Sequence, residues 1–357
     1  MALTVETLVD LPGWTAALRF VPQPQRDEVQ KSAHAGFEAV TADKHFVAER
    51  YFKAALNALS AAEDALAHAS KAADGAVAVA PRARGGLAGD AMPTVMGVRM
   101  VRELLLASRG FKICTSKCAD SRAIMAEADM SNTSWKPVSV DKKTGYGTYY
   151  RGEPGMSTHS FKVVGMVHAE VVALACVLLE LDLYKEWFPF CYFSTVVKEE
   201  SRFHKSSRFA VRVPWPLANR EVAITGFGHD DLDDGRVVVK ACSDPALGEE
   251  PSRKGNVMAE LKLGGFYIEP VAKRDTRITF FMNIDPHIPH LPAAVLNWTS
   301  GNLMWVMLRQ LSVASVKAME PDSIYAKRRA ARPDVYEYFT ARANEVLKNL
   351  PDEPPSA

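Results

Sequence analysis

The residues that could carry catalytic or metal chemistry are few and scattered along the sequence. Cys114 and Cys118 are four residues apart, so a helix would place both thiols on one face, where they could bind a metal ion. No second Cys or His pair follows them at the spacing of metal ligands. His159, His168 and His204 fall in or beside strand-like segments, but the chain carries no G-x-S-x-G, H-E-x-x-H or phosphate-loop motif. We therefore expect no metal ion, no cofactor and no enzymatic activity.

Composition and charge narrow the class of protein. The chain has 357 residues, of which 48% are hydrophobic and 24% charged, as in globular proteins with a sizeable core. Lys and Arg total 43 and Asp and Glu total 42, so nothing favours nucleic acid as a partner. Five cysteines form no dense disulfide framework, which indicates a reducing compartment.

The sequence shows no strong targeting signal. Its start lacks the basic segment of a signal peptide. The longest apolar stretch, 171–183, is interrupted by Glu180 and Asp182 and is too short to span a bilayer. The expected location is cytoplasmic, peripheral to membranes.

Helix-breaking residues and the spacing of apolar residues divide the chain into five parts. Apolar residues recur at helix-like spacings in an Ala-rich segment with a break near Asp43, which predicts a hairpin of two helices. The segment after it is rich in Gly, Ala and Pro, which indicates a linker. The expected parts are an irregular lead-in (1–25), the helical hairpin (26–73), the linker (74–91), a principal domain (92–320) and a C-terminal helical tail (321–357).

From Trp135 onward apolar and polar residues alternate, which is typical of antiparallel strands with one buried face. The clearest segments are 161–168, 208–213, 256–263 and 277–284. One helix, about 169–187, interrupts the strands, and a long apolar helix, 291–319, follows them. Because a curved sheet needs a cover for its apolar face, this last helix is expected to lie on it. The predicted fold class is α+β, preceded by a small helical region.

Three segments of this region resemble a known family: LDLYKEWFPF (Leu181 to Phe190), PWPLANRE (Pro214 to Glu221) and the apolar helix with Leu-Asn-Trp at 296–298. Together they are similar to the START (steroidogenic acute regulatory-related lipid-transfer) domain family over about 93–318, and most of all to its phosphatidylcholine transfer protein branch. The resemblance implies a helix-grip fold, in which a curved antiparallel sheet wraps around a long C-terminal helix and encloses a lipid cavity.

The resemblance also implies a function. A START-like domain binds one lipid molecule in its hydrophobic cavity and carries it between membranes, with transient contact with the membrane surface. Such a cavity is useful because each CH₂ group exposed to water costs about 0.8 kcal/mol. Two alternatives stay open, a lipid-sensing scaffold or adaptor protein and a hydrolase or cyclase of the related helix-grip type.

The expected ligand-binding residues come from the segments around such a cavity. In the proline-flanked loop, Trp215 is expected to act as a gate at the membrane, with a cap on the core as the alternative. Arg220 is expected to be structural, in an ion pair with a nearby acid that orders the loop. The predicted inward stripe of the C-terminal helix consists of Val295, Trp298, Asn302, Trp305 and Arg309. The full ligand-binding set is Tyr184, Trp187, Phe188, Phe209, Val211, Trp215, Leu217, Phe280, Met282, Val295, Trp298, Asn302 and Trp305.

The choice of lipid is predicted from two missing charged pairs. The phosphatidylcholine branch uses an Arg and an Asp where this chain has Tyr184 and Phe188. The sterol-binding branch uses a buried Glu and Arg where this chain has Ser207 and Gly226. A less polar ligand is therefore expected, such as a sterol, carotenoid or other isoprenoid, with a phospholipid as the alternative.

The helical hairpin and two runs of charged residues also have predicted roles. The hairpin 26–73 loosely resembles a microtubule-interacting-and-trafficking or tetratricopeptide-type hairpin, so it either binds a protein partner or merely packs on the carrier domain. The charged runs Asp230 to Asp234 and Lys327 to Arg329 are expected to be a solvated hairpin and a solvated helix end.

Overall fold

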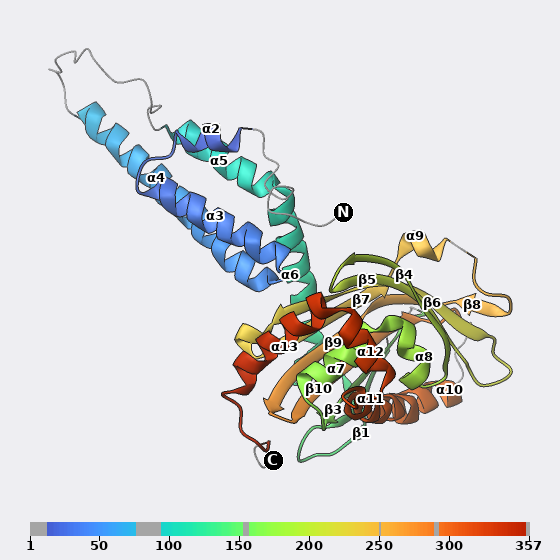
Figure 1. Cartoon of the computed structure of the whole chain (residues 1–357). Helices are drawn as coiled ribbons and strands as arrows, with labels where there is room; N and C mark the ends of the chain where they lie inside the picture. The colour runs from blue at the N-terminus through green and yellow to red at the C-terminus, as the bar shows by residue number, and fades with distance from the viewer. Residues whose placement is uncertain (1–12, 76–93, 153–156, 250, 289–292, 355–357) are drawn as a thin grey trace. The chain divides into compact units, whose positions relative to one another are not determined.

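The computed structural model of the chain describes residues 13–75, 94–152, 157–249, 251–288 and 293–354. The chain divides into two compact units, Met1–Ala119 and Asp120–Ala357 (Figure 1). This division falls later than the domain start predicted at residue 92, because the helix after the linker packs with helices of the first unit.

The first unit is helical. Its described elements are α2 (Trp14–Leu18), α3 (Gln25–Thr41), α4 (His45–Gly75), α5 (Val95–Ala107) and the first half of α6 (Arg109–Ala128). The chain reverses between α3 and α4 at Asp43, which has a left-handed φ of 59°. Phe37 and Phe52 pack edge to face across this hairpin, with ring centroids 5.1 Å apart. Val98 and Val101 of α5 complete the core, so α5 belongs to this unit.

The second unit contains a ten-stranded sheet within the described residues. Its strands are β1 (Lys136–Val140), β2 (Gly147–Gly152), β3 (His159–Val167), β4 (Cys191–Ser201), β5 (His204–Val211), β6 (Asn219–Asp231), β7 (Arg236–Ser243), β8 (Asn256–Met258), β9 (Glu260–Ala272) and β10 (Asp275–Asp285). They are ordered β1-β2-β3-β10-β9-β7-β6-β5-β4 in antiparallel pairs, while the short β8 pairs in parallel with β6. The predicted strand 256–263 is thus broken at Ala259, whose N–H donates to the carbonyl of Glu221.

Helices cover the concave face of the sheet (Figure 1). The predicted helix 169–187 is interrupted at Glu180, and its parts are α7 (Val171–Leu179), the 3₁₀ turn η1 (Leu181–Leu183) and α8 (Tyr184–Trp187). The C-terminal helix consists of α10 (Ala293–Trp298), the π-helical stretch η3 (Thr299–Leu303) and α11 (Met304–Ala318). Because α11 packs against β3 and α7, with Leu308 over Gly165, the predicted helix-grip fold is confirmed.

Two more helices, α12 (Ile324–Ala331) and α13 (Pro333–Leu347), follow the grip helix. They do not form a separate tail, because Tyr325, Tyr336 and Phe339 are at most 5% exposed and belong to the same core cluster as Leu174 and Leu311. α13 contacts α7 and the 3₁₀ turn η2 (Leu232–Asp234). A short helix, α9 (Pro245–Gly248), begins the loop after β7.

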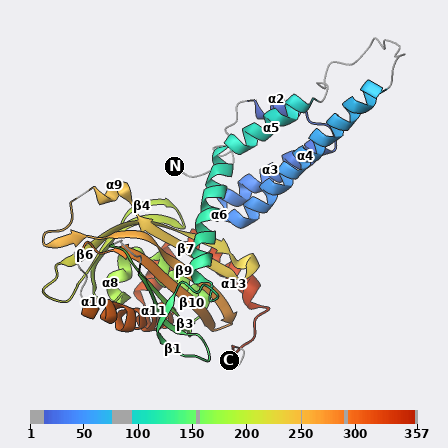
Figure 2. The same cartoon turned by 180° about the vertical axis from the view of Figure 1, so that it is seen from behind.

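The end of α6 covers the opposite face of the sheet beside β7, β9 and β10 (Figure 2). There Ile124 and Trp135 pack on Phe281. The Lys162 ammonium lies 4.7 Å from the ring centroid of Trp135 and 5.2 Å from that of Tyr149. Burial lowers the pKa of Lys162 to about 8. The Lys162 ammonium therefore lies against two aromatic rings, and its burial costs desolvation free energy.

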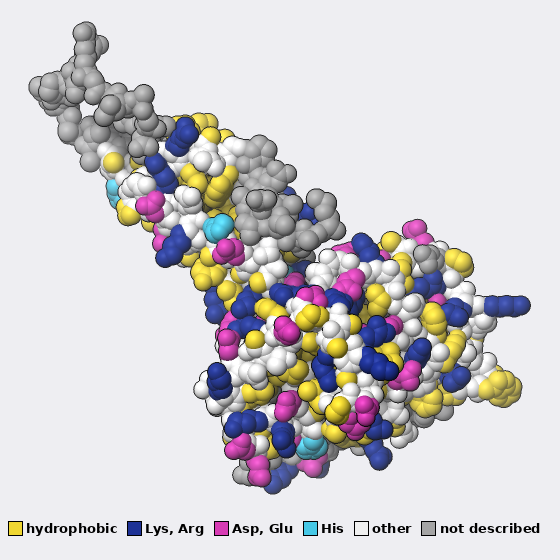
Figure 3. All heavy atoms as spheres, in the orientation of Figure 1, with side chains coloured by type: hydrophobic (Ala, Val, Ile, Leu, Met, Phe, Trp, Pro, Cys, Tyr) yellow, Lys and Arg dark blue, Asp and Glu magenta, His cyan; other side chains and the backbone are white. Residues whose placement is uncertain are grey.

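Charged side chains of both signs are interspersed on the face of the second unit seen in Figure 3. Such mixing matches the near-equal totals of basic and acidic residues. On this face there is no broad basic stripe of the kind that binds nucleic acid phosphates.

Candidate functional site

The second unit contains a partly open cavity of about 270 Å³. It lies between the concave face of the sheet and the helical segments α7, η1, α8 and α10–η3. Its wall is mainly aliphatic and aromatic, including Leu178, Val222, Ile224, Phe266 and Ile284. The cavity approaches the lower end of the volume range of small-molecule sites, about 300–1,000 Å³.

Glycines on the inward face of the sheet help to explain why this space stays open. Side chains alternate along a strand, so Gly226 and Gly228 share the inward face of β6 with Val222 and Ile224. Gly264 lies at the corresponding face of β9. A Cβ atom added at Gly228 would meet only the Cβ of Phe203, at 3.7 Å. The sheet therefore leaves open space at Gly228, whereas a Cβ atom at Gly226 or Gly264 would lie 3.0 or 3.2 Å from a backbone oxygen.

The cavity extends along β5 and β6. One end lies beside the β5–β6 loop and includes Arg212, Arg220 and Ile288. The other includes Asp230 and Phe339 of α13. Ten residues separate Arg220 from Asp230 on β6, which corresponds to roughly 30 Å of strand. These are called the loop end and the α13 end below.

Aromatic side chains protrude at the loop end. Trp215 is 92% exposed, and Phe190, which lines the cavity, is 47% exposed. The backbone carbonyl of Phe190 accepts from the N–H of Arg212 at 2.9 Å, so Phe190 is adjacent to the start of the Trp215 loop. An exposed indole such as that of Trp215 can enter a membrane interface.

Arg220 is tied to this loop by carbonyl oxygens. Its guanidinium donates to the carbonyl of Pro286 at 2.5 Å and to that of Ala218. The predicted acid partner is replaced by these carbonyls, because the neighbouring Glu221 pairs with Arg208 at 2.8 Å. Arg220 also lines the cavity, and burial lowers its pKa.

The α13 end is closed by buried polar contacts. The carboxylate of Asp230, 1% exposed, accepts from the Tyr338 hydroxyl at 2.8 Å and from Arg342 at 3.1 Å. Arg342 also contacts Asp233 at 2.8 Å. The prediction that Asp230 to Asp234 form a solvated hairpin is therefore wrong for Asp230 and Asp231, which are buried, and holds for Asp233 and Asp234, which are exposed. The Asp230 carboxylate is buried because α13 folds over this turn and supplies the counter-charge.

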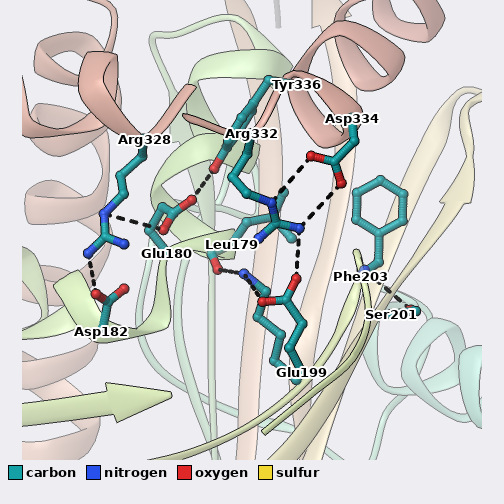
Figure 4. A network of polar contacts seen from close by, with 11 residues as sticks. Leu179, Glu180, Asp182, Glu199, Ser201, Phe203, Arg328, Arg332, Asp334 and Tyr336 are labelled. Carbon is teal, nitrogen blue, oxygen red and sulfur yellow. Dashed lines mark hydrogen bonds and ion pairs between the residues drawn. The ribbon is translucent and has the colours of Figure 1, made fainter. Parts of the chain in front are cut away.

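A second set of contacts joins α12 and α13 to α7, η1 and β4 (Figure 4). Tyr336 donates to Glu180 at 2.5 Å, and Arg328 pairs with Asp182. Arg332 donates to Glu199 at 2.7 Å. The prediction of a solvated helix end at Lys327 to Arg329 is wrong for Arg328 and Arg329, since Arg329 donates to the carbonyl of Ala318.

The structure brings part of the predicted site together. Seven of the predicted residues line the cavity: Tyr184, Phe188, Phe209, Val211, Phe280, Met282 and Val295. Trp187 is buried behind them, with its ring centroid 5.0 Å from that of Tyr184. Trp215 and Leu217 lie in the loop outside the lining, and the side chain of Trp298 lies outside the described residues.

The predicted inward stripe of the C-terminal helix is wrong from Asn302 of η3 onward. Asn302, Trp305 and Arg309 are exposed, with Trp305 at 38%. The reason is the π-helical stretch, whose wider turn shifts the helix face that follows it. The inward residues of α11 are instead Met304, Met307, Leu308 and Leu311.

Sequence reasoning missed several lining residues. Val222, Ile224 and Phe266 could have been found from strand alternation on β6 and β9. Leu178 and Leu179 of α7 and Phe339 of α13 had no local signal, because their place depends on how distant helices fold back.

The candidate catalytic groups do not assemble with one another. His159 lines the cavity, and burial lowers its pKa. His168 pairs with Asp275 at 2.6 Å, and His204 contacts Thr225 at 3.1 Å. Across the described ranges, no three His, Cys, Asp or Glu side chains gather as metal ligands, and no helix is long and apolar enough to cross a membrane.

The fold and its apolar-lined cavity define a helix-grip protein with an internal cavity. The family model of the START domain matches residues 118–321, which is more than half of the chain. The chain belongs to the START domain family, as its motifs predicted.

The structures of two human proteins, STARD10 and StAR-related lipid transfer protein 5, are similar to that of this chain. Human STARD10 is 19% identical with a TM-score of 0.49, and the match covers 65% of this chain and 89% of that chain. Human StAR-related lipid transfer protein 5 is 17% identical with a TM-score of 0.47, over 58% and 99% of the two chains. No curated protein matches the chain by sequence.

Proposed function

We propose that this protein is a lipid carrier that binds one lipid molecule in the cavity of the second unit and transfers it between membranes. The observation that carries the proposal is the apolar-lined cavity of about 270 Å³ in a START domain. An unfilled apolar cavity leaves the side chains that line it without packing partners, so the lipid-free protein carries a penalty in stability. A ligand that fills it removes this penalty and keeps its own apolar surface out of water.

The lining favours a ligand with little charge. Tyr184 and Phe188 form part of an aromatic wall with Phe209, and the Tyr184 hydroxyl donates to the carbonyl of Leu178. Two charged side chains at the ends of the cavity, Arg220 and Asp230, are hydrogen-bonded to groups of the protein itself. A sterol, carotenoid or other isoprenoid therefore fits the proposal better than a phospholipid with a charged head group.

Lipid exchange is proposed to occur at the loop end. Trp215 and Phe190 present exposed aromatic surface there, and Arg212 adds a positive charge that would favour an anionic membrane. The protein would thus act at the cytoplasmic surface of membranes, with Trp215 as the gate.

The first unit has a core of its own and is proposed to bind a protein partner. Met96 and Met100 lie one turn apart on α5 and are 82% and 50% exposed. Flexible methionine side chains suit adaptable protein contacts. Adding the isolated first unit in excess should then compete with the full chain for its partner without affecting lipid binding.

The test is mass spectrometry of lipid that co-purifies with the full chain, followed by transfer of that lipid between donor and acceptor liposomes. One bound lipid per chain and catalysed transfer are expected. Binding without transfer would indicate the lipid-sensing scaffold, and a chemically altered lipid would indicate the hydrolase or cyclase. Protein that neither retains nor takes up any lipid would refute the proposal.

A further inference from the structure

The α13 end of the cavity is built by helices beyond the START match. The match ends at residue 321, whereas α12 and α13 span Ile324–Leu347. Phe339 of α13 is 3% exposed and lines the cavity, with its ring centroid 6.4 Å from that of Phe203. α13 is therefore part of the cavity wall.

The contacts of α13 fix this wall firmly. On one side of Phe339, Tyr336 donates to Glu180. On the other side, Tyr338 and Arg342 bind the buried carboxylate of Asp230, which itself lines the cavity. Opening this end would leave Asp230 without its counter-charge in an apolar setting, which is strongly unfavourable. The wall therefore resists displacement by a ligand.

We propose that α13 is the end stop of the cavity and that Phe339 sets the length of the ligand that the cavity accepts. The inference rests on the proposed function. A lipid that enters at the loop end passes along β5 and β6, and its leading end meets the Phe339 ring last. The ligand class is then a lipid whose extended apolar part has a fixed maximum length.

The experiment measures how saturated 1-alkanols from decanol to hexacosanol, a range whose extended length passes the roughly 30 Å between the two ends, displace a fluorescent lipid from the full chain. In the wild type, each further buried methylene should strengthen binding about fourfold until the chain reaches Phe339. Phe339→Ala should extend this rise by roughly three methylenes, the depth of the removed ring, and Phe339→Trp should end it earlier.

Val335→Ala is the matched control. Val335 lies on the same helix and is equally buried, at 3% exposed, but it does not line the cavity. It should lower the melting temperature without moving the alkanol length at which the gain in affinity stops. If Phe339→Ala does not fold, Phe339→Leu gives the smaller change in the same direction.

The outcomes separate the two hypotheses. A stopping length that is the same in the wild type and in the folded Phe339 variants would overturn the end stop and leave the proposed function intact. The same would hold if Val335→Ala moved the stopping length as far as Phe339→Ala does. A wild-type chain that binds no alkanol and no membrane lipid would overturn both.

Discussion

Gly228→Leu should separate ligand binding from protein stability. Gly228 lies on the inward face of β6 and lines the cavity, and its φ is not left-handed. A Cβ there meets only Phe203, at an ordinary contact distance of 3.7 Å. The Cβ atom of a substituted residue therefore fits without strain in the strand, and we expect the rest of the leucine side chain to extend into the cavity.

The expected magnitude follows from the space that the leucine takes. Its four side-chain carbons displace about four carbons of the ligand, each worth about 0.8 kcal/mol, so affinity should fall by about 3 kcal/mol, or roughly 200-fold. The lipid-free variant fills part of a void, so its free energy of unfolding should stay level or rise. A loss of binding with no loss of stability is the signature.

The assay compares Kd for the co-purified lipid with urea unfolding of the lipid-free protein. Gly248→Leu is the control, because Gly248 is exposed on α9 outside the cavity and has open space around it. Unchanged affinity in Gly228→Leu would show that the ligand does not occupy this part of the cavity. Loss of both affinity and stability would show that the leucine cannot fit, which would refute the reasoning about open space.

Four further predictions concern other parts of the chain. Trp215→Ala should slow liposome transfer several-fold while the melting temperature stays nearly constant, because the indole is 92% exposed; a large fall in melting temperature with unchanged transfer would favour the core cap. Arg342→Met should lower the free energy of unfolding in urea by about 3 kcal/mol, since it leaves Asp230 buried and unpaired. Stability should rise between pH 8 and 10.5, because unfolded Lys162 keeps a proton that the folded form releases with its pKa of about 8; Lys162→Met should abolish this rise in pH-dependent urea melts. A fragment of residues 109–357 should fold alone by circular dichroism, whereas a cut at residue 89 should give a less soluble fragment, because it exposes Val98 and Val101.

The alternation of apolar and polar residues was sufficient to predict the sheet and many of the residues that line the cavity. Alternation on β5 and β10 predicted the inward positions of Phe209 and Phe280, because a strand has only two faces and one is buried. The START motifs supplied the topology that alternation alone does not determine. Helix periodicity failed in η3, since it assumes a constant turn.

The α13 end was beyond prediction for a different reason. Asp230 and Arg342 are 112 residues apart, and neither carries a local sign that it will be buried. Runs of charged residues are usually exposed to solvent, so the sequence favoured a solvated hairpin at Asp230 to Asp234. Only the long-range return of α13 to the β6–β7 turn converts the acidic run into an ion-paired support for the cavity.

The void between sheet and grip helix also bears on the protein's lifetime. A whole domain is typically stable by only about 5–15 kcal/mol, so the packing that is missing around an unfilled cavity weighs heavily in that balance. Chains without cargo should then unfold more often and be degraded sooner, whereas loaded chains persist. The steady-state abundance of the protein is expected to follow the supply of its ligand, with no dedicated sensor.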